Sequence, residues 1–292
     1  MTRTGEGRPT AIVMDGLALR DELLEGLAKR IEAAGSPPIC LVTVLVGDDA
    51  PSQRYVRSKQ RKATEIGMQP RHVDLPATAS QGQVEAAVAE LAADPDIHGI
   101  LVQLPMPSGL DPEPVIDLIP PEKDVDGLTE RSMGRLVRGV PGLVGATPLG
   151  VMRLLERYGV ETVGRRAVVV GRSQLVGLPL SLLLARKGVD ATVTMAHSRT
   201  ADMAAVCREA DILVAAAGQA HMITADHVKP GAAVIDVGQS RTAEGVVGDV
   251  DPAAVAPIAG WLTPNPGGTG PMTIACLLEN TLTAAVLQGV AV

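Results

Sequence analysis

The chain has 292 residues, is 46% hydrophobic and carries a formal net charge of −7. This length allows two domains that each have a core, and the acidic balance argues against a nucleic-acid-binding surface. With no Phe, one Trp and two Tyr, we expect cores of Ala, Val, Leu and Ile in tightly packed α/β layers.

The sequence shows no segment that we interpret as a membrane span, a leader or a metal site. The start of the chain has no apolar stretch and we find no apolar run of 18 residues, so we predict a soluble, cytoplasmic protein. The five histidines lack metal-ligand spacing, so we expect no metal. We expect free, buried thiols in a reducing compartment at three cysteines: Cys40, Cys207 and Cys276.

The first half of the chain has the pattern of an α/β unit. We predict helices over 17–34, 52–66 and 84–93, and strands over 39–46 and 97–102. Ser52 is the expected N-cap of the second helix. The Pro-rich segment 120–128 breaks regular structure, and a linker near 128–148, rich in Gly, Arg and Pro, leads into the second half.

Tyr55 and Lys59 lie four positions apart on the second predicted helix, so their side chains share one face. A lysine in a pocket is useful as a base because burial lowers its pKa. The alternative is a solvated basic face, which the local pattern favours because four more basic residues lie on this helix: Arg54, Arg57, Arg61 and Lys62.

Polar residues also follow the predicted strand 97–102. Gln103 lies at its carboxyl end, the edge where parallel sheets bind ligands, although it can equally be a polar residue that ends a strand. Asp124 and Asp126 share one side of an extended chain. A carboxylate there could accept two hydrogen bonds from an amino-pyrimidine ring, while the local sequence favours a turn-forming Asp-Gly pair.

Residues 164–186 have the pattern of a strand, a loop and a helix. Ala167–Val170 fits a strand buried on both faces, Gly171 a sharp turn, and Gly177 a close approach of helix to sheet. The N-terminus of that helix would face an anion such as a nucleotide phosphate. The spacing departs from G-x-G-x-x-G, so by itself it also fits an ordinary strand–helix turn.

Three further strands are predicted over 191–196, 211–217 and 232–237, with helices between them, which indicates a parallel Rossmann-type sheet. His197-Ser198-Arg199 follows the first of these strands, where an NAD site usually has a carboxylate. A hydroxyl and a guanidinium suit a 2′-phosphate, so NADP is favoured; a solvated basic turn is the alternative. A last helix over 272–287 is expected to pack back against the first half.

Eight segments in one order, from about residue 46 to 275, closely resemble the bifunctional methylenetetrahydrofolate dehydrogenase/methenyltetrahydrofolate cyclohydrolase family. They are VGDDAPSQRYVRSKQRKATEIGM, GILVQLPMP, PEKDVDGL, ATPLG, GRSQLVGLP, ATVTMAHSRT, VIDVG and PGGTGPMT. The resemblance implies a dimer of two-domain subunits with folate in the cleft. It implies a catalytic, folate-binding domain over 1–128 and 272–292 and an NADP-binding Rossmann-type domain over 149–271.

The resemblance also implies roles for single residues. Lys59 matches the family's catalytic lysine, Tyr55 its active-site tyrosine, Gln103 the glutamine that orients the lysine, and Asp126 the carboxylate that holds the pterin. The cofactor-binding positions of the family fall on Gly171, Arg172, Ser173, Ser198 and Gln239.

The implied chemistry is oxidation of 5,10-methylenetetrahydrofolate with NADP, followed by hydrolysis of the methenyl product to 10-formyltetrahydrofolate. One alternative is a dehydrogenase without efficient cyclohydrolase activity, and another is a non-catalytic NADP-binding regulator. A formyltetrahydrofolate ligase would need an ATP site, and the sequence contains no G-x-x-x-x-G-K-[ST].

The sequence departs from the family pattern at four places, which leaves cofactor affinity and the balance of the two activities open. Gly-Gly-Val-Gly is replaced at 267–270, Asp-Pro-Ala-Ser at 49–52, Cys-Thr-Pro at 146–148, and Ile-Asn at 239–240. The changed positions carry Thr269, Ala50, Pro51, Ala146, Gln239 and Ser240.

Overall fold

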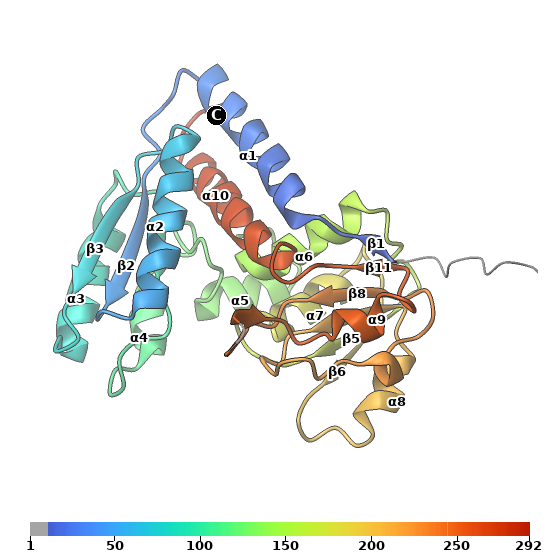
Figure 1. Cartoon of the computed structure of the whole chain (residues 1–292). Coiled ribbons are helices and arrows are strands. Elements are labelled where there is room, and N and C mark those ends of the chain that lie inside the picture. Colours follow the sequence, from blue (N-terminus) through green and yellow to red (C-terminus); the bar gives the residue numbers. More distant parts are fainter. Residues whose placement is uncertain (1–10, 244) are drawn as a thin grey trace, which may run out of the picture. The chain divides into compact units, whose positions relative to one another are not determined.

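A computed structural model describes residues 11–243 and 245–292, which form two compact units (Figure 1). The three-stranded unit comprises Arg20–Leu149 and Thr273–Val292. The six-stranded unit comprises residues 11–19 and Gly150–Met272. The helices α1 (Gly16–Ala33), α6 (Ala146–Arg157) and α10 (Thr269–Leu287) each contribute residues to both units.

The three-stranded unit is built on a parallel sheet in the order β3-β2-β4. The strands are β2 (Leu41–Val46), β3 (Arg71–Leu75) and β4 (Gly99–Val102). Every residue of β2 and β4 is buried, as the short apolar runs predict. The remaining helices of this unit are α2 (Ala50–Glu65), α3 (Gln81–Ala93), α4 (Pro112–Ile116) and α5 (Glu130–Val137).

The six-stranded unit contains a parallel sheet in the order β1-β11-β8-β7-β5-β6. The chain leaves β5 to one side for β6 and then returns to the other side for β7, so the topology reverses at β5. Such a reversal marks the ligand-binding edge of a doubly wound sheet. The strands are β1 (Ile12–Val13), β5 (Arg166–Val170), β6 (Thr192–Ala196), β7 (Ile212–Ala215), β8 (Ala233–Asp236) and β11 (Trp261–Leu262).

The other elements of this unit cover the sheet or connect its strands. They are α7 (Gly177–Ala185), α8 (Met203–Arg208), a 3₁₀ turn η1 (Ala225–His227), the hairpin β9 (Ser240–Thr242) and β10 (Gly245–Val247), and α9 (Pro252–Val255). The four strands predicted in the second half of the sequence are confirmed as β5, β6, β7 and β8. The buried Ala, Val, Ile and Leu residues of β5, β7 and β8, with Ala196 of β6, contribute to the core of this unit, whereas most of β6 is not buried.

Three sequence-based boundaries need correction. Residues 12–19 were predicted with the first domain, whereas Ile12 and Val13 pair with Trp261 and Leu262 in the six-stranded sheet. The expected linker near 128–148 contains helix α5. The N-cap of α2 is Asp49, whose carboxylate accepts a hydrogen bond from the Ser52 N–H at 2.8 Å. Ser52 therefore lies inside the first turn of α2. Pro51 lies in the same turn, where a residue without an N–H is compatible with the start of a helix.

Helix α10 is confirmed as part of the three-stranded unit from Thr273 onward. Among the described residues it is the one helix long and apolar enough to span a membrane, with a mean hydropathy of 1.3. The sequence pattern predicts no such helix. Within this helix, 56% of the most apolar 18-residue window is buried. Its buried Asn280 and Thr281 side chains hydrogen-bond to backbone carbonyls. This is the pattern of a core helix.

Candidate functional site

Helix α2 has one buried face, and Lys59 lies on it. The buried residues of the helix are Ser52, Val56, Lys59 and Ala63, which recur at three- and four-residue intervals. Lys59 is only 8% exposed. The solvated basic face that the local pattern favoured is therefore wrong for Lys59.

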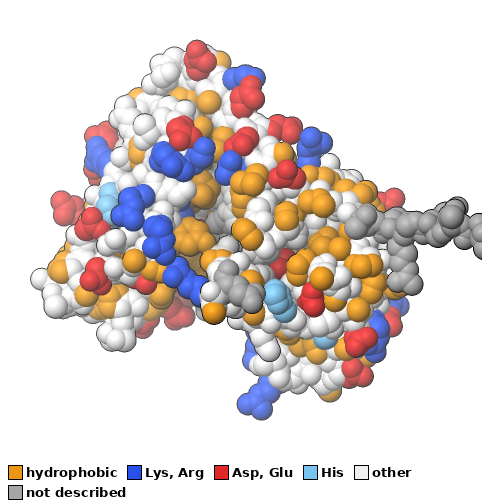
Figure 2. All heavy atoms as spheres, viewed as in Figure 1, with side chains coloured by type: hydrophobic (Ala, Val, Ile, Leu, Met, Phe, Trp, Pro, Cys, Tyr) orange, Lys and Arg blue, Asp and Glu red, His pale blue; other side chains and the backbone are white. Residues whose placement is uncertain are grey.

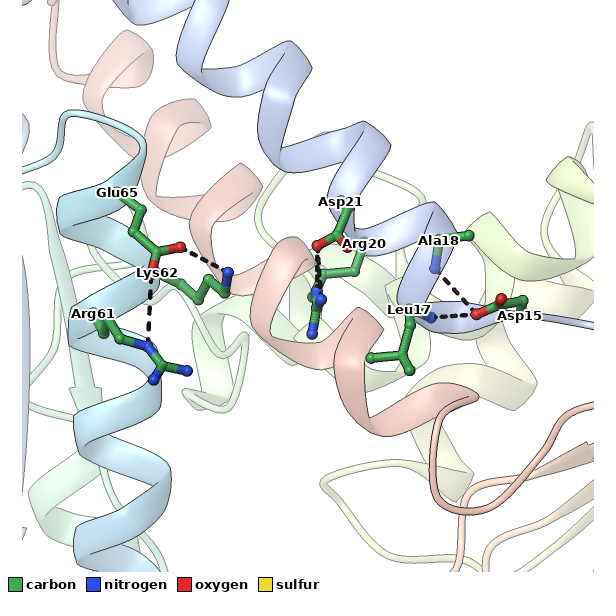
Figure 3. A network of polar contacts seen from close by, with 8 residues as sticks. All are labelled: Asp15, Leu17, Ala18, Arg20, Asp21, Arg61, Lys62 and Glu65. Carbon is green, nitrogen blue, oxygen red and sulfur yellow. Dashed lines mark hydrogen bonds and ion pairs between the residues drawn. The ribbon is translucent and has the colours of Figure 1, made fainter.

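The opposite face of α2 is the solvated basic face that the local pattern predicts. Arg54, Arg57 and Arg61 are exposed, and Figure 2 shows Lys and Arg side chains along this helix. Near its C-terminal end the Glu65 carboxylate pairs with Lys62 Nζ at 2.7 Å and with Arg61 Nε at 3.6 Å (Figure 3). Helix periodicity thus separates one buried lysine from its solvated neighbours.

The buried amine of Lys59 is held by the side chain that follows β4. Lys59 Nζ donates a hydrogen bond to Gln103 Oε1 at 3.0 Å. Gln103 Nε2 in turn donates to the Leu104 carbonyl at 2.6 Å, which fixes the amide with its oxygen toward the lysine. The structure therefore brings together Lys59 and Gln103, two predicted site residues 44 positions apart.

The two predicted carboxylates at 124 and 126 have different surroundings. Asp124 is buried and accepts hydrogen bonds from the Leu128 N–H at 3.1 Å and the Thr129 N–H at 2.9 Å. Asp124 therefore stabilises the turn over residues 124–129 that leads into α5. Asp126 is partly buried, and its charge acts on Lys59. Only Asp126 thus belongs with the buried lysine.

Burial shapes the protonation of this pair. It lowers the pKa of Lys59, and the Asp126 carboxylate opposes that shift. Burial likewise raises the pKa of Asp126. The charge of Lys59 opposes this rise, and the charge of Asp124 adds to it. Both shifts favour the neutral forms, since the low local dielectric penalises isolated charges. A neutral amine can accept a proton at a pH where an exposed lysine cannot.

Tyr55 lies one helical turn before Lys59 and is 44% exposed. Its side chain is therefore partly open to solvent, on the part of the helix surface that adjoins Lys59 in the helical spacing. An exposed aromatic residue at such a position is available to contact a ligand.

The six-stranded unit contains the predicted strand–loop–helix. A Cβ on Gly171, which has φ +125, would lie 2.2 Å from the Ala216 carbonyl oxygen, and one on Gly177 would lie 2.2 Å from the Gly171 oxygen. Both positions therefore need glycine. The N-cap residue of α7, Val176, has no capping side chain, and the helix follows the loop at the carboxyl edge of the sheet, where an anion is favoured.

Further predicted cofactor residues lie at the same edge. Arg172 and Ser173 are exposed in the loop after β5, and Ser198 and Arg199 are exposed in the turn after β6. β5 and β6 are paired, and the Gly171 N–H bonds to the Ala196 carbonyl at 2.8 Å, so loop and turn are adjacent. Gln239 is exposed just after β8.

Some polar residues that support these positions were missed by the sequence analysis. Asn280 on α10 donates to the Val125 carbonyl at 2.8 Å and to the Val144 carbonyl at 2.7 Å, and so holds the backbone next to Asp126. Asp236 and Asp249 are buried in the six-stranded unit. A polar residue inside an otherwise apolar run was the available signal for Asn280 and Asp236.

The three cysteines are free and buried, as expected. Within residues 11–243 and 245–292 there is no group of three or more His, Cys, Asp or Glu side chains that could hold a metal ion.

Comparison with known proteins matches both units. Residues 14–126 match the tetrahydrofolate dehydrogenase/cyclohydrolase catalytic domain, and residues 145–289 match the NAD(P)-binding domain of the same family. The chain is 54% identical over 280 residues to "Bifunctional protein FolD 2" of Frankia casuarinae, which covers 94% of this chain and 96% of that protein.

Solved structures also match nearly the whole chain. The bifunctional FolD enzyme of Campylobacter jejuni has a TM-score of 0.92 at 38% identity, covering 95% of this chain and 99% of that one. The Trypanosoma brucei enzyme, complexed with NADP and an inhibitor, has a TM-score of 0.91 at 38% identity, covering 97% and 100%. The chain therefore belongs to the tetrahydrofolate dehydrogenase/cyclohydrolase family.

Proposed function

We propose that this protein oxidises 5,10-methylenetetrahydrofolate to 5,10-methenyltetrahydrofolate with NADP and then hydrolyses that product to 10-formyltetrahydrofolate. The observation that carries the proposal is the buried Lys59 amine, hydrogen-bonded to Gln103 and accompanied by Asp126. The "bifunctional" relatives, which match nearly the whole chain, support the two-step activity. The relative complexed with NADP supports the choice of cofactor.

The six-stranded unit fits a dinucleotide. Gly171 and Gly177 leave the loop after β5 no room for side chains at those positions, so its backbone can approach a pyrophosphate closely. Ser198 and Arg199 would receive the 2′-phosphate, because a hydroxyl and a guanidinium bind it where a carboxylate would repel it. We assign Arg172, Ser173 and Gln239 to the same cofactor site.

In the oxidation, bound NADP supplies the acceptor for the hydride that leaves the methylene carbon. This chain's residues bind and orient the folate. Asp126 is assigned to the amino-pyrimidine ring, to which a carboxylate can accept two hydrogen bonds. Tyr55 is assigned to the adjoining surface of the substrate. The oxidised product is a cationic amidinium, which further disfavours the charged form of Lys59.

In the hydrolysis, water adds to the methenyl carbon and Lys59 accepts a proton from it. The amine can do so because burial keeps its pKa low. Gln103 holds the amine in position through its side-chain oxygen. Breakage of one of the two C–N bonds at the former methenyl carbon, with a proton returned to the departing nitrogen, leaves the formyl group on the other nitrogen.

We further infer that the enzyme is soluble, cytoplasmic and a homodimer. The burial of α10 inside the three-stranded unit supports solubility. The resemblance to the family is the ground for the dimer and for the cytoplasm. Sedimentation velocity of the purified protein tests the dimer, since a species of one chain mass would contradict it.

The assignment of Lys59 is tested by Lys59→Ala. We expect the loss of methenyltetrahydrofolate hydrolysis with NADP binding unchanged, because only the proton acceptor is removed. Decay of methenyl absorbance measures hydrolysis, and titration calorimetry measures NADP binding. Lys62→Ala is the matched control, because Lys62 lies on the same helix and pairs with Glu65.

Two results would contradict parts of this proposal. If Lys59→Ala hydrolyses at the wild-type rate, the role of the lysine is wrong. If the unaltered protein reduces NADP with methylenetetrahydrofolate but does not accelerate methenyl decay, the protein is a dehydrogenase alone.

A further inference from the structure

A buried carboxylate in the six-stranded unit organises the loop that follows β7. Asp249 is fully buried. Its Oδ2 accepts hydrogen bonds from the Ala217 N–H at 2.6 Å and the Gly218 N–H at 3.0 Å, and its Oδ1 accepts one from the Gln219 N–H at 2.7 Å. Successive backbone N–H groups of this kind form a concave anion site. Here the protein's own carboxylate occupies it.

A second carboxylate fixes the first. Asp236 ends β8, and its side chain accepts hydrogen bonds from the Asp249 N–H at 2.9 Å and the Val250 N–H at 3.2 Å. Glycines leave space for both carboxylates. A Cβ on Gly238 would lie 1.9 Å from Asp249 Oδ1, and a Cβ on Gly248 would lie 1.7 Å from Asp236 Oδ2.

The loop held by Asp249 touches the loop after β5. The Ala216 carbonyl oxygen, one residue before the three bound N–H groups, lies 2.2 Å from where a Cβ on Gly171 would be. The two loops end β7 and β5, the neighbouring strands at which the topology of the sheet reverses. This is the edge that binds a dinucleotide in such folds.

We propose that Asp249, fixed by Asp236, is a positioning residue for the cofactor: it holds loop 217–219 against the Gly171 loop and so sets the shape of the NADP site. The inference rests on the proposed NADP-dependent function and extends it to residues that contact no substrate. The chain of contacts runs from the Asp236 carboxylate through Asp249 to loop 217–219 and Gly171.

The test compares Asp249→Asn with Asp251→Asn by NADP calorimetry and by thermal unfolding without cofactor. Asparagine at 249 has the same shape but replaces one acceptor oxygen with a donor. At least one buried N–H then lacks a partner, enough to change an equilibrium constant roughly tenfold. Asp251 is the matched control, because its carboxylate also accepts two backbone N–H bonds, at the start of α9.

We expect Asp249→Asn to raise the Kd and the KM for NADP roughly tenfold or more. The rate of methenyl hydrolysis, which uses no NADP, should stay near that of the unaltered protein. Asp251→Asn should leave the Kd for NADP unchanged, because Oδ1 alone accepts both of its backbone bonds and asparagine keeps that oxygen. A lower Tm for Asp249→Asn with a Kd within about twofold of the unaltered protein would overturn the proposal, because the role would then be structural alone.

A second pair of variants covers the case in which Asp249→Asn does not fold. Gly218 has φ +68 and Gly231 has φ +82, and a Cβ on either would meet nothing within 4 Å. Gly218→Ala strains the loop without touching the carboxylate, while Gly231→Ala imposes similar strain before β8. Weaker NADP binding by Gly218→Ala alone supports the proposal, and equal binding by both variants refutes it. Failure of the unaltered protein to bind NADP would instead refute the proposed function.

Discussion

The chemistry of Lys59 follows from its place on the helix and not from its neighbours in the sequence. Arg57 and Arg61, two positions to either side, are exposed, while Lys59 is 8% exposed. An offset of two positions turns a residue by about 200° around an α-helix. A tract that looks uniformly basic in sequence is thus divided in the structure into a solvated face and one buried amine.

The pH dependence of hydrolysis tests the state of this amine. Burial lowers the Lys59 pKa, so the fraction of neutral base, and with it the rate, should rise with pH and level off below the pH at which an ordinary lysine deprotonates. Gln103→Glu adds a negative charge at the atom that contacts Nζ, which favours the ammonium form. In Gln103→Glu, the pH range over which the hydrolysis rate rises (the rising limb) should therefore move to higher pH.

The measurement is a pH–rate profile of methenyl decay for both proteins. Gln69→Glu, the same change at an exposed position after α2, is the control and should leave the limb in place. A limb that does not move in Gln103→Glu would mean that a group other than Lys59 titrates.

Two departures from the family pattern are accommodated by their surroundings. Thr269, which stands where the family has Val, is buried, and its Oγ1 donates to the Asp236 carbonyl at 2.9 Å. The added hydroxyl is therefore satisfied and costs little. Pro51 lies in the first turn of α2, where a missing N–H is tolerated. Neither change disturbs Lys59 or Gln103.

At the scale of elements, the space around each glycine decides whether a side chain can be added there. Gly177 begins α7 against the Gly171 backbone, whereas Gly26 lies within α1 with nothing within 4 Å of an added Cβ. Gly177→Ala should destabilise the protein and weaken NADP binding, because the loop after β5 must move. Gly26→Ala should instead raise the free energy of unfolding by up to about 1 kcal/mol, because alanine has the higher helix propensity.

Chemical denaturation and NADP calorimetry measure the two effects. Each variant serves as the other's control, since both change glycine to alanine in a helix. A Gly177→Ala protein with unchanged NADP affinity would show that the loop tolerates the shift.

The elements were predicted most accurately where the sequence has a strong hydrophobic pattern. β7 and β8 are short buried runs that lie within the predicted ranges, and β5 extends the predicted range by one residue, the exposed Arg166. Helix α5 was missed because its Gly and Arg residues are typical of a linker. It is started by Thr129, whose side chain accepts the Ser132 N–H at 3.1 Å, a local cap that composition does not indicate.

At the scale of the whole molecule, residues distant in sequence complete each site. Asn280 lies 155 positions from Val125, yet it bonds the carbonyl just before Asp126. Asn280→Leu leaves one buried and one partly buried carbonyl group without this donor, at a cost of roughly 1–3 kcal/mol. We expect a lower free energy of unfolding and a higher KM for folate, with NADP affinity unchanged.

Steady-state kinetics with varied folate, together with NADP calorimetry, measure this effect. Thr283→Val is the control, because Thr283 lies on the same helix and its hydroxyl bonds only the exposed turn at Glu279. An unchanged folate KM in Asn280→Leu would show that Asp126 is positioned without α10.

The sequence by itself predicted the two α/β units, the parallel strands and the loop after β5, because local periodicity carries that information, while Lys59, Gln103 and Asp126 were proposed from the resemblance to the family. Only the tertiary structure decided that Lys59 is buried and bonded to Gln103, and that Asp124 is tied to backbone N–H groups. It also decided that Ile12 and Val13 join the six-stranded sheet and that Asp249 holds the loop after β7. These features depend on contacts between residues far apart in the chain, and no local pattern encodes such a partner.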